Sequence, residues 1–173
     1  MTRKGFAAAA LGLLIAPPGA FAQMPMPAEA HAPAKPSTTL VVTVDGRATT
    51  YTLADLQAMP QRTLKVQNGH TQTEETYTGV AVSDLLAKAG ISMDTLKRVY
   101  HSYIKAEGTD HYWVLYSASE VQSGLRQGEA IIAISQDGKP LTSDGQFKIV
   151  ETGEKRPARW VRNLMSLTVV TVE

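Results

Sequence analysis

The sequence predicts an α+β domain built from mixed β-sheets and short helices, spanning residues 39–173. Segments rich in β-branched residues outnumber the helical ones, and every helical segment is short. The dipeptides Asp45-Gly46 and Asp137-Gly138 are strong tight-turn signals between such segments. Because long helices do not alternate with the strands, a doubly wound parallel sheet is not expected.

The predicted strands are short and separated by polar or glycine-containing segments. They cover residues 39–44, 47–51, 63–66, 99–106, 111–116, 130–135, 146–150 and 167–172. Residues 67–75 are polar and contain Gly69, so we expect a loop there.

Four short helices are predicted from capping signals, and they begin near Thr52, Ser83, Ser117 and Pro157. Asp55 stands three residues after the first cap and completes a capping box. Met59-Pro60 ends this first helix, and Gly90 stops the second.

Residues 1–22 have the three-part pattern of a secretory signal peptide. Arg3 and Lys4 precede an apolar run at residues 7–16, and Ala20-Phe21-Ala22 is a cleavage site of small residues. The run is far shorter than the ~20 residues that a membrane span requires. We therefore expect a periplasmic or secreted protein without a membrane span.

Residues 23–38 are rich in proline and alanine, which is typical of a spacer. Met24, Met26 and His31 are soft donors of the kind that bind copper. No folded scaffold fixes their geometry, so no metal site is predicted there.

Composition excludes several classes of function. The 173 residues include no cysteine, which removes disulfides, zinc-thiolate sites and thiol nucleophiles. The formal net charge is +1, so no strong field would attract nucleic acid. The sequence has no GxSxG, HExxH or phosphate-loop motif, and no catalytic or metal-ligating residue is predicted.

The histidines do not predict a metal pair. A hairpin around residues 107–110 would pair Ala106 with His111 and His101 with Tyr116. In that register the two histidines point to opposite faces of the sheet, because side chains alternate along a strand.

A basic stretch near the C-terminus is a candidate binding surface. It comprises Lys148, Lys155, Arg156, Arg159 and Arg162, interrupted by Glu151 and Glu154. A helix would place Arg159 and Arg162 on one face, where their guanidinium groups suit a phosphate. A solvated charged surface is the simpler interpretation. Trp160 is expected to anchor the helix on a sheet.

Read together, several segments resemble a known family. They are Tyr77-Thr78-Gly79-Val80 followed by Asp84-Leu85-Leu86 and Gly90, then Asp137-Gly138-Lys139-Pro140-Leu141, then Arg159-Trp160-Val161. In this order they resemble the molybdopterin-binding domain of sulfite oxidase-type oxidoreductases, and most of all its short exported single-domain relatives. The resemblance runs from about Leu40 to the end of the chain.

This resemblance implies a molybdenum-bound pyranopterin whose phosphate is held by basic and polar side chains. It also implies a cysteine ligand in the loop after the strand at 63–66, at or near Gln67, where this sequence has no cysteine. Glutamine is a weak neutral donor where the metal needs a soft thiolate. Lys148 stands where arginine is common, and residues 141–145 lack the family's histidine.

We therefore expect a non-catalytic binding or accessory module and expect no bound cofactor, while the resemblance leaves molybdopterin as the alternative. Its candidate ligand is a small anion or a pterin-like molecule, and a periplasmic protein partner stays open. The candidate cofactor-binding residues are Gln67, Asn68, His70, Tyr112, Lys148, Arg159 and Arg162. The alternative is an active molybdopterin-dependent oxidoreductase or redox subunit with a non-cysteine ligand such as His70.

Overall fold

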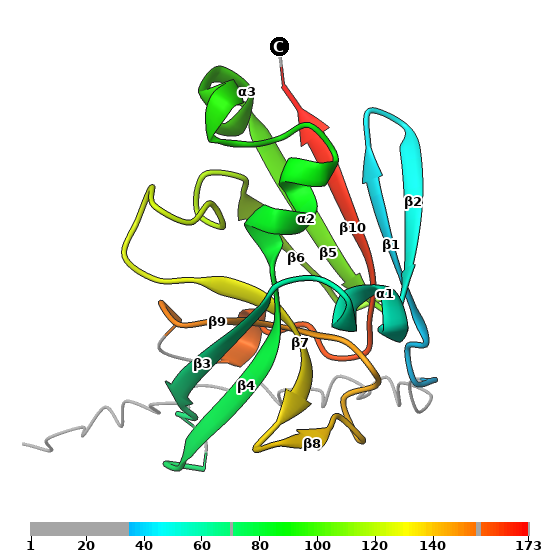
Figure 1. Cartoon of the computed structure of the whole chain (residues 1–173), viewed down its shortest axis with the longest axis vertical. Helices are drawn as coiled ribbons and strands as arrows, with labels where there is room; N and C mark the ends of the chain where they lie inside the picture. Colours follow the sequence, from blue (N-terminus) through cyan, green and yellow to red (C-terminus); the bar gives the residue numbers. More distant parts are fainter. Residues whose placement is uncertain (1–34, 70, 155–156, 173) are drawn as a thin grey trace, which may run out of the picture. The chain divides into compact units, whose positions relative to one another are not determined.

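Two mixed or antiparallel sheets with few short helices make up the part of the chain that the computed structural model describes, residues 35–69, 71–154 and 157–172. The predicted α+β class is confirmed (Figure 1). The predicted signal peptide, Met24, Met26, His31 and His70 all lie outside the described residues.

The first sheet has the strand order β2–β1–β10–β5–β6. Its strands are β1 (Thr39–Val44), β2 (Arg47–Thr52), β5 (Ser102–Gly108), β6 (Trp113–Ser117) and β10 (Leu164–Thr171). The C-terminal strand β10 lies parallel to β1 and antiparallel to β5, so this sheet is mixed. The predicted turn at Asp45-Gly46 joins β1 to β2, with both residues at positive φ.

The second sheet has the order β3–β4–β7–β8, and β9 also pairs with β7. These strands are β3 (Gln61–Gln67), β4 (Glu74–Ala81), β7 (Ala130–Gln136), β8 (Lys139–Pro140) and β9 (Lys148–Glu151). All of its pairings are antiparallel.

The helices are α1 (Leu53–Gln57), α2 (Val82–Lys88) and α3 (Leu96–Tyr100), with 3-10 turns η1 (Met93–Thr95) and η2 (Pro157–Arg159). The predicted capping box of α1 is confirmed, because Thr52 and Asp55 bond each other's backbone N–H groups. Gly90 ends α2 at φ +82°, and the Ile91 N–H bonds the Leu86 carbonyl 2.9 Å away.

Both faces of the second sheet carry buried residues. One face shares the large core with the first sheet and with Leu85 and Leu86 of α2. The other face carries a smaller cluster in which Leu64, Val66 and Tyr77 pack under Trp160. The segment around η2 therefore covers part of the second sheet.

The predicted spacer is in contact with the domain at its C-terminal end. Ser37 is buried, and its carbonyl accepts a hydrogen bond of 3.1 Å from the Gln146 N–H. The Lys35 carbonyl accepts a second bond from the Thr109 hydroxyl.

Two loop predictions are wrong. Residues 67–75 are not one loop, because β3 continues to Gln67 and β4 begins at Glu74. The ends of these strands were missed because their residues are polar. These residues face solvent or a cleft rather than the core. Ser117–Glu120 opens no helix but a series of turns. The cap-like bond from the Ser117 N–H to Glu120 is present, but Gly124 and Gly128 interrupt the following segment.

The region around the histidines also differs from its prediction. Residues 99 and 100 belong to α3, and the hairpin pairs Ala106 with Val114 rather than with His111. The last paired residues are Glu107 and Trp113, so five residues separate them instead of the predicted four, and the Gly108 N–H donates to the Tyr112 carbonyl over 2.9 Å. His101 precedes β5 and His111 follows it, so they lie at opposite ends of the strand.

The α2 cap and the last helix need correction as well. Ala81, not Ser83, precedes the first residue of α2, and no side chain caps that end. The helix predicted at Pro157 is only the single turn η2. Trp160 and Arg162 follow it outside the helix, so Arg159 and Arg162 share no helical face.

We predict that Gly79→Ala lowers the free energy of unfolding by at least about 2 kcal/mol. A Cβ atom at this position of β4 would lie 2.0 Å from the Ile132 carbonyl oxygen of β7, and backbone cannot move aside as a side chain can. Urea denaturation of both proteins measures the difference.

Gly138→Ala is the matched control. An added Cβ there meets no atom within 4 Å, but φ is +75°, so we expect a loss of only about 1 kcal/mol. Equal losses for the two variants would contradict the close approach of β4 and β7.

Candidate functional site

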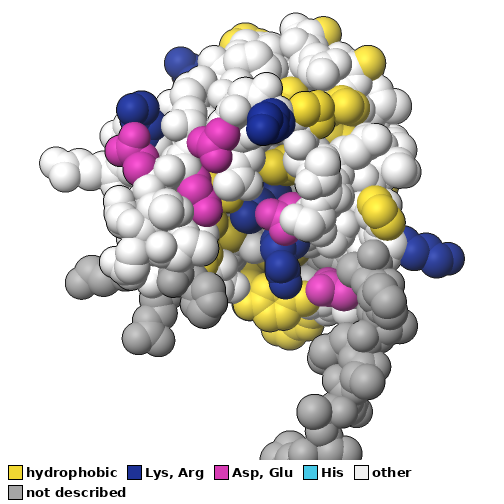
Figure 2. Space-filling view, turned by 90° about the horizontal axis from the view of Figure 1, so that it is seen from below, with side chains coloured by type: hydrophobic (Ala, Val, Ile, Leu, Met, Phe, Trp, Pro, Cys, Tyr) yellow, Lys and Arg dark blue, Asp and Glu magenta, His cyan; other side chains and the backbone are white. Residues whose placement is uncertain are grey.

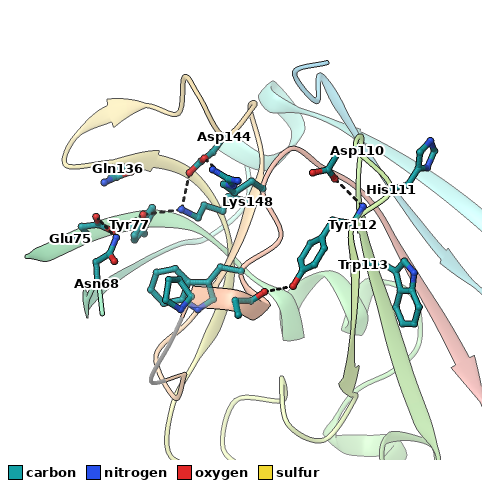
Figure 3. Close-up of a pocket in the computed structure, with 14 residues that line it drawn as sticks. Asn68, Glu75, Tyr77, Asp110, His111, Tyr112, Trp113, Gln136, Asp144 and Lys148 are labelled. Atoms are coloured by element: carbon teal, nitrogen blue, oxygen red, sulfur yellow. Dashed lines mark hydrogen bonds and ion pairs between the residues drawn. The ribbon is translucent and has the colours of Figure 1, made fainter. Parts of the chain in front are cut away.

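A cleft of about 990 Å³ lies where the second sheet meets the β5–β6 turn (Figure 3). One wall is formed by the ends of β3, β4 and β7 that Trp160 does not cover. The opposite wall is the turn from Asp110 to Trp113. Residues Pro157 and Ala158 of η2 line it between these walls.

Strand alternation places the polar residues in this cleft. Leu64 and Val66 of β3 point into the small core, so Asn68, two residues further on, lies on the same side. Glu75 and Tyr77 share the corresponding face of β4. The floor of the cleft is thus the polar continuation of the face that Trp160 covers.

A buried ion pair stands at the centre of the cleft. The Lys148 Nζ lies 2.8 Å from an Asp144 carboxylate oxygen, and both residues are buried. The same Nζ lies 5.0 Å from the ring centre of Tyr77 and 5.7 Å from that of Trp160. Asp144 and two aromatic rings therefore compensate the charge of Lys148.

Glu75 is the other buried carboxylate of the floor, with 9% of its surface exposed. One of its oxygens accepts a bond of 2.8 Å from the Asn68 amide, and the other accepts one of 2.8 Å from the Tyr77 hydroxyl. Both donors are neutral. Among the described residues, Glu75 forms no ion pair.

Tyr77 links the Glu75 carboxylate to the ion pair of Lys148 and Asp144. Its hydroxyl accepts a hydrogen bond of 3.1 Å from Lys148 while it donates to Glu75. Burial raises the pKa of the Tyr77 hydroxyl well above its usual range, and the hydrogen bond to Glu75 raises it further. Tyr77 therefore stays protonated at neutral pH and keeps donating to Glu75.

The opposite wall is aromatic and more exposed. Tyr112 is 48% exposed, and its hydroxyl donates to the Ala158 carbonyl 2.5 Å away. Asp110 accepts the Tyr112 N–H at 3.0 Å, which fixes the turn. Trp113 lies at the rim, where the Lys105 ammonium stands 5.4 Å from the centre of its ring.

The structure brings four of the predicted site residues to the cleft, Asn68, Tyr112, Lys148 and Arg162. Gln67 does not line it, because its side chain lies on the other face of β3 and donates to the Gln72 carbonyl. His70 lies outside the described residues. Arg162 is largely exposed and approaches Asp144 at 3.9 Å.

Arg159 belongs to a different cluster. Its guanidinium contacts Glu120 at 2.7 Å, Glu154 at 2.6 Å and the Leu115 carbonyl at 2.8 Å. Its guanidinium also lies over the Tyr116 ring. Burial alone would lower the pKa of Arg159, but hydrogen bonds to Glu120 and Glu154 outweigh it and raise that pKa. Arg159 thus fastens η2 to β6 and the turns after it.

Three carboxylates near Arg159 lie close enough together to suggest a cation site. They belong to Glu120, Glu151 and Glu154. Arg126 pairs with the buried Glu151, and Arg159 pairs with the other two. Because guanidinium groups already occupy this cluster, we interpret it as an ion-pair network that holds the loops together.

Sequence reasoning missed several cleft residues, and the buried ones among them are Glu75, Tyr77, Asp144 and Trp160. A weak signal was available for two of them. Glu75 and Tyr77 are two residues apart, as Leu64 and Val66 are, so a strand predicted through residue 75 would have placed both side chains on one face.

Figure 2 shows the molecule from below, where basic and acidic side chains lie next to each other.

The comparisons with known proteins agree with the predicted resemblance. Residues 29–147 match the model of a family described as the oxidoreductase molybdopterin binding domain. The match ends just before Lys148, so Trp160 and Arg162 lie beyond it. A search of curated proteins finds no match.

A solved structure shares the fold. The sulfane dehydrogenase SoxCD from Paracoccus pantotrophus superposes with a TM-score of 0.58 at 18% sequence identity. The alignment covers 76% of this chain and 37% of that one, so this chain spans well under half of the structure it resembles.

None of the helices in residues 35–69, 71–154 and 157–172 is long and apolar enough to cross a bilayer.

We predict that Arg159→Ala lowers the free energy of unfolding by about 2 kcal/mol, because it removes the guanidinium that bonds Glu154 and leaves Glu120 only the more distant Arg126 at 3.9 Å. Arg162→Ala should change stability by less than about 0.5 kcal/mol, since its side chain is 67% exposed. Urea denaturation compares the two. Equal effects would show that Arg159 is not a structural residue.

Proposed function

The chain belongs to the oxidoreductase molybdopterin-binding domain family, and we propose that it is an exported, non-catalytic member that binds a small ligand in the cleft. An accessory role beside another exported protein falls within this proposal. The observation that carries it is the set of donor atoms that the cleft offers.

The cleft residues do not fit the metal of the cofactor. The family resemblance implies a thiolate ligand after β3, and the chain contains no cysteine. The side chain that β3 delivers to the cleft is Asn68, whose neutral amide donates to Glu75. Amide and carboxylate oxygens are hard donors, whereas the expected ligand is a soft thiolate.

The cations of the described cleft also fit a phosphate poorly. Lys148 and Arg162 both approach the same carboxylate, Asp144. A phosphate would have to compete with this carboxylate and would lie near the buried charge of Glu75. This supports a ligand other than the complete cofactor.

An active molybdopterin-dependent oxidoreductase or redox subunit is the alternative. The family match favours it, and the Glu75 and Asp144 carboxylates offer oxygen donors in place of sulfur. Metal analysis separates the two proposals.

We predict that protein purified from a molybdenum-competent host contains no stoichiometric molybdenum and releases no fluorescent pterin when it is denatured, because no thiolate is present to hold the metal. Mass spectrometry of the metal content and fluorescence of the denatured extract measure both. An established molybdoenzyme produced in the same cells is the control. Near-stoichiometric molybdenum would refute the non-catalytic proposal.

Export is part of the proposal and is supported by the pattern of residues 1–22. We predict that the chain is recovered from the periplasm or medium with Gln23 at its N-terminus, as measured by mass spectrometry. A variant without residues 2–22 should remain in the cytoplasm. An uncleaved full-length protein in the cytoplasmic fraction would refute export.

A further inference from the structure

We propose that the cleft selects a planar organic cation with paired N–H donors, of the amidine or protonated amino-heterocycle class, through the carboxylate of Glu75. This inference rests on the proposed ligand-binding function and names the chemistry of the ligand. It differs from the small anion that the basic stretch suggested.

Glu75 is a buried carboxylate without a direct counter-charge among the described residues. A buried carboxylate normally has a cation beside it, because desolvation of an isolated charge is costly. Lys148 reaches Glu75 only through the neutral Tyr77 hydroxyl, as Figure 3 shows. The described residues therefore supply Glu75 with hydrogen bonds but with no direct counter-charge.

The Glu75 carboxylate can accept more hydrogen bonds than Asn68 and Tyr77 donate to it. An ionised carboxylate offers about four acceptor sites, and Asn68 and Tyr77 use one on each oxygen. One site on each oxygen is left, which matches the two parallel N–H groups of an amidinium. Because Asn68 and Tyr77 hold the carboxylate in place, little side-chain entropy remains to be lost on binding.

Lys148 and Arg162, the lysine and arginine that line the described cleft, are both close to Asp144. Lys148 is paired with Asp144 and faces the rings of Tyr77 and Trp160. Arg162 approaches the same Asp144 from the exposed side. These two charges are compensated, so an anionic ligand that binds either of them would have to compete with Asp144.

The size and lining of the cleft also suit a flat organic ligand. Its volume of about 990 Å³ is at the upper end for small-molecule sites. Tyr112 presents a half-exposed ring on the wall opposite Glu75. An aromatic wall favours flat and cationic groups through stacking and cation–π contacts.

The test uses three isosteric probes, benzamidine, benzamide and benzoate, which are cationic, neutral and anionic. Both tryptophans of the chain, Trp113 and Trp160, line the cleft, so intrinsic fluorescence reports binding there. We expect saturable binding of benzamidine, at least about tenfold tighter than that of benzamide. Benzoate should bind more weakly still.

Glu75→Gln removes the charge and keeps the shape, and it should weaken benzamidine binding at least about tenfold. Glu74→Gln is the matched control, because it makes the same change one residue earlier. Glu74 lies on the other face of β4, where it pairs with Lys65 at 3.1 Å. This control should leave benzamidine binding unchanged.

Each outcome decides the inference. Preference for benzamidine that depends on Glu75 supports it. Preference for benzoate, equal binding of the three probes, or no binding of any probe to the wild-type protein overturns it. Because the wild-type comparison needs no variant, poor folding of Glu75→Gln cannot mask the result. Benzoate binding without molybdenum would leave the non-catalytic proposal intact, whereas stoichiometric molybdenum would refute that proposal by itself.

Discussion

The contact between Trp160 and Tyr77 is the constraint on which the rest of the site depends. Their rings meet edge to face with centres 6.0 Å apart, and both are almost fully buried. The Trp160 ring covers the apolar part of one face of the second sheet. It does not reach the polar end of that face, which stays open. The cleft is therefore a consequence of how far the η2 segment extends over the sheet.

Charge pairing then decides what this open face can do. Asp144 pairs with both Lys148 and Arg162, whereas the groups that donate hydrogen bonds to Glu75 in the described part of the chain are neutral. The family is named for binding an anionic cofactor. In this member, the described part of the cleft presents a carboxylate without a direct counter-charge. The chemistry of the site follows from these pairings rather than from the number of basic residues near it.

The two arginines of the basic stretch show why counting charges was insufficient. They are three residues apart in sequence, and a helix would have placed them together. The helix is a single turn, so Arg159 turns to Glu120 and Glu154 while Arg162 faces the cleft. Four of the seven predicted site residues line the cleft, and the buried residues that were missed come from β4, from the loop at Asp144 and from the segment after η2.

The sequence by itself determined the α+β class, most strands, the cap of α1 and the stop at Gly90, because these depend on local propensity and alternation. It also determined the absence of any thiolate. Only the tertiary structure decided the strand order, the register of β5 with β6 and the partners of each charge. Those features depend on contacts between residues far apart in the chain, such as Lys148 with Tyr77, which no local pattern records.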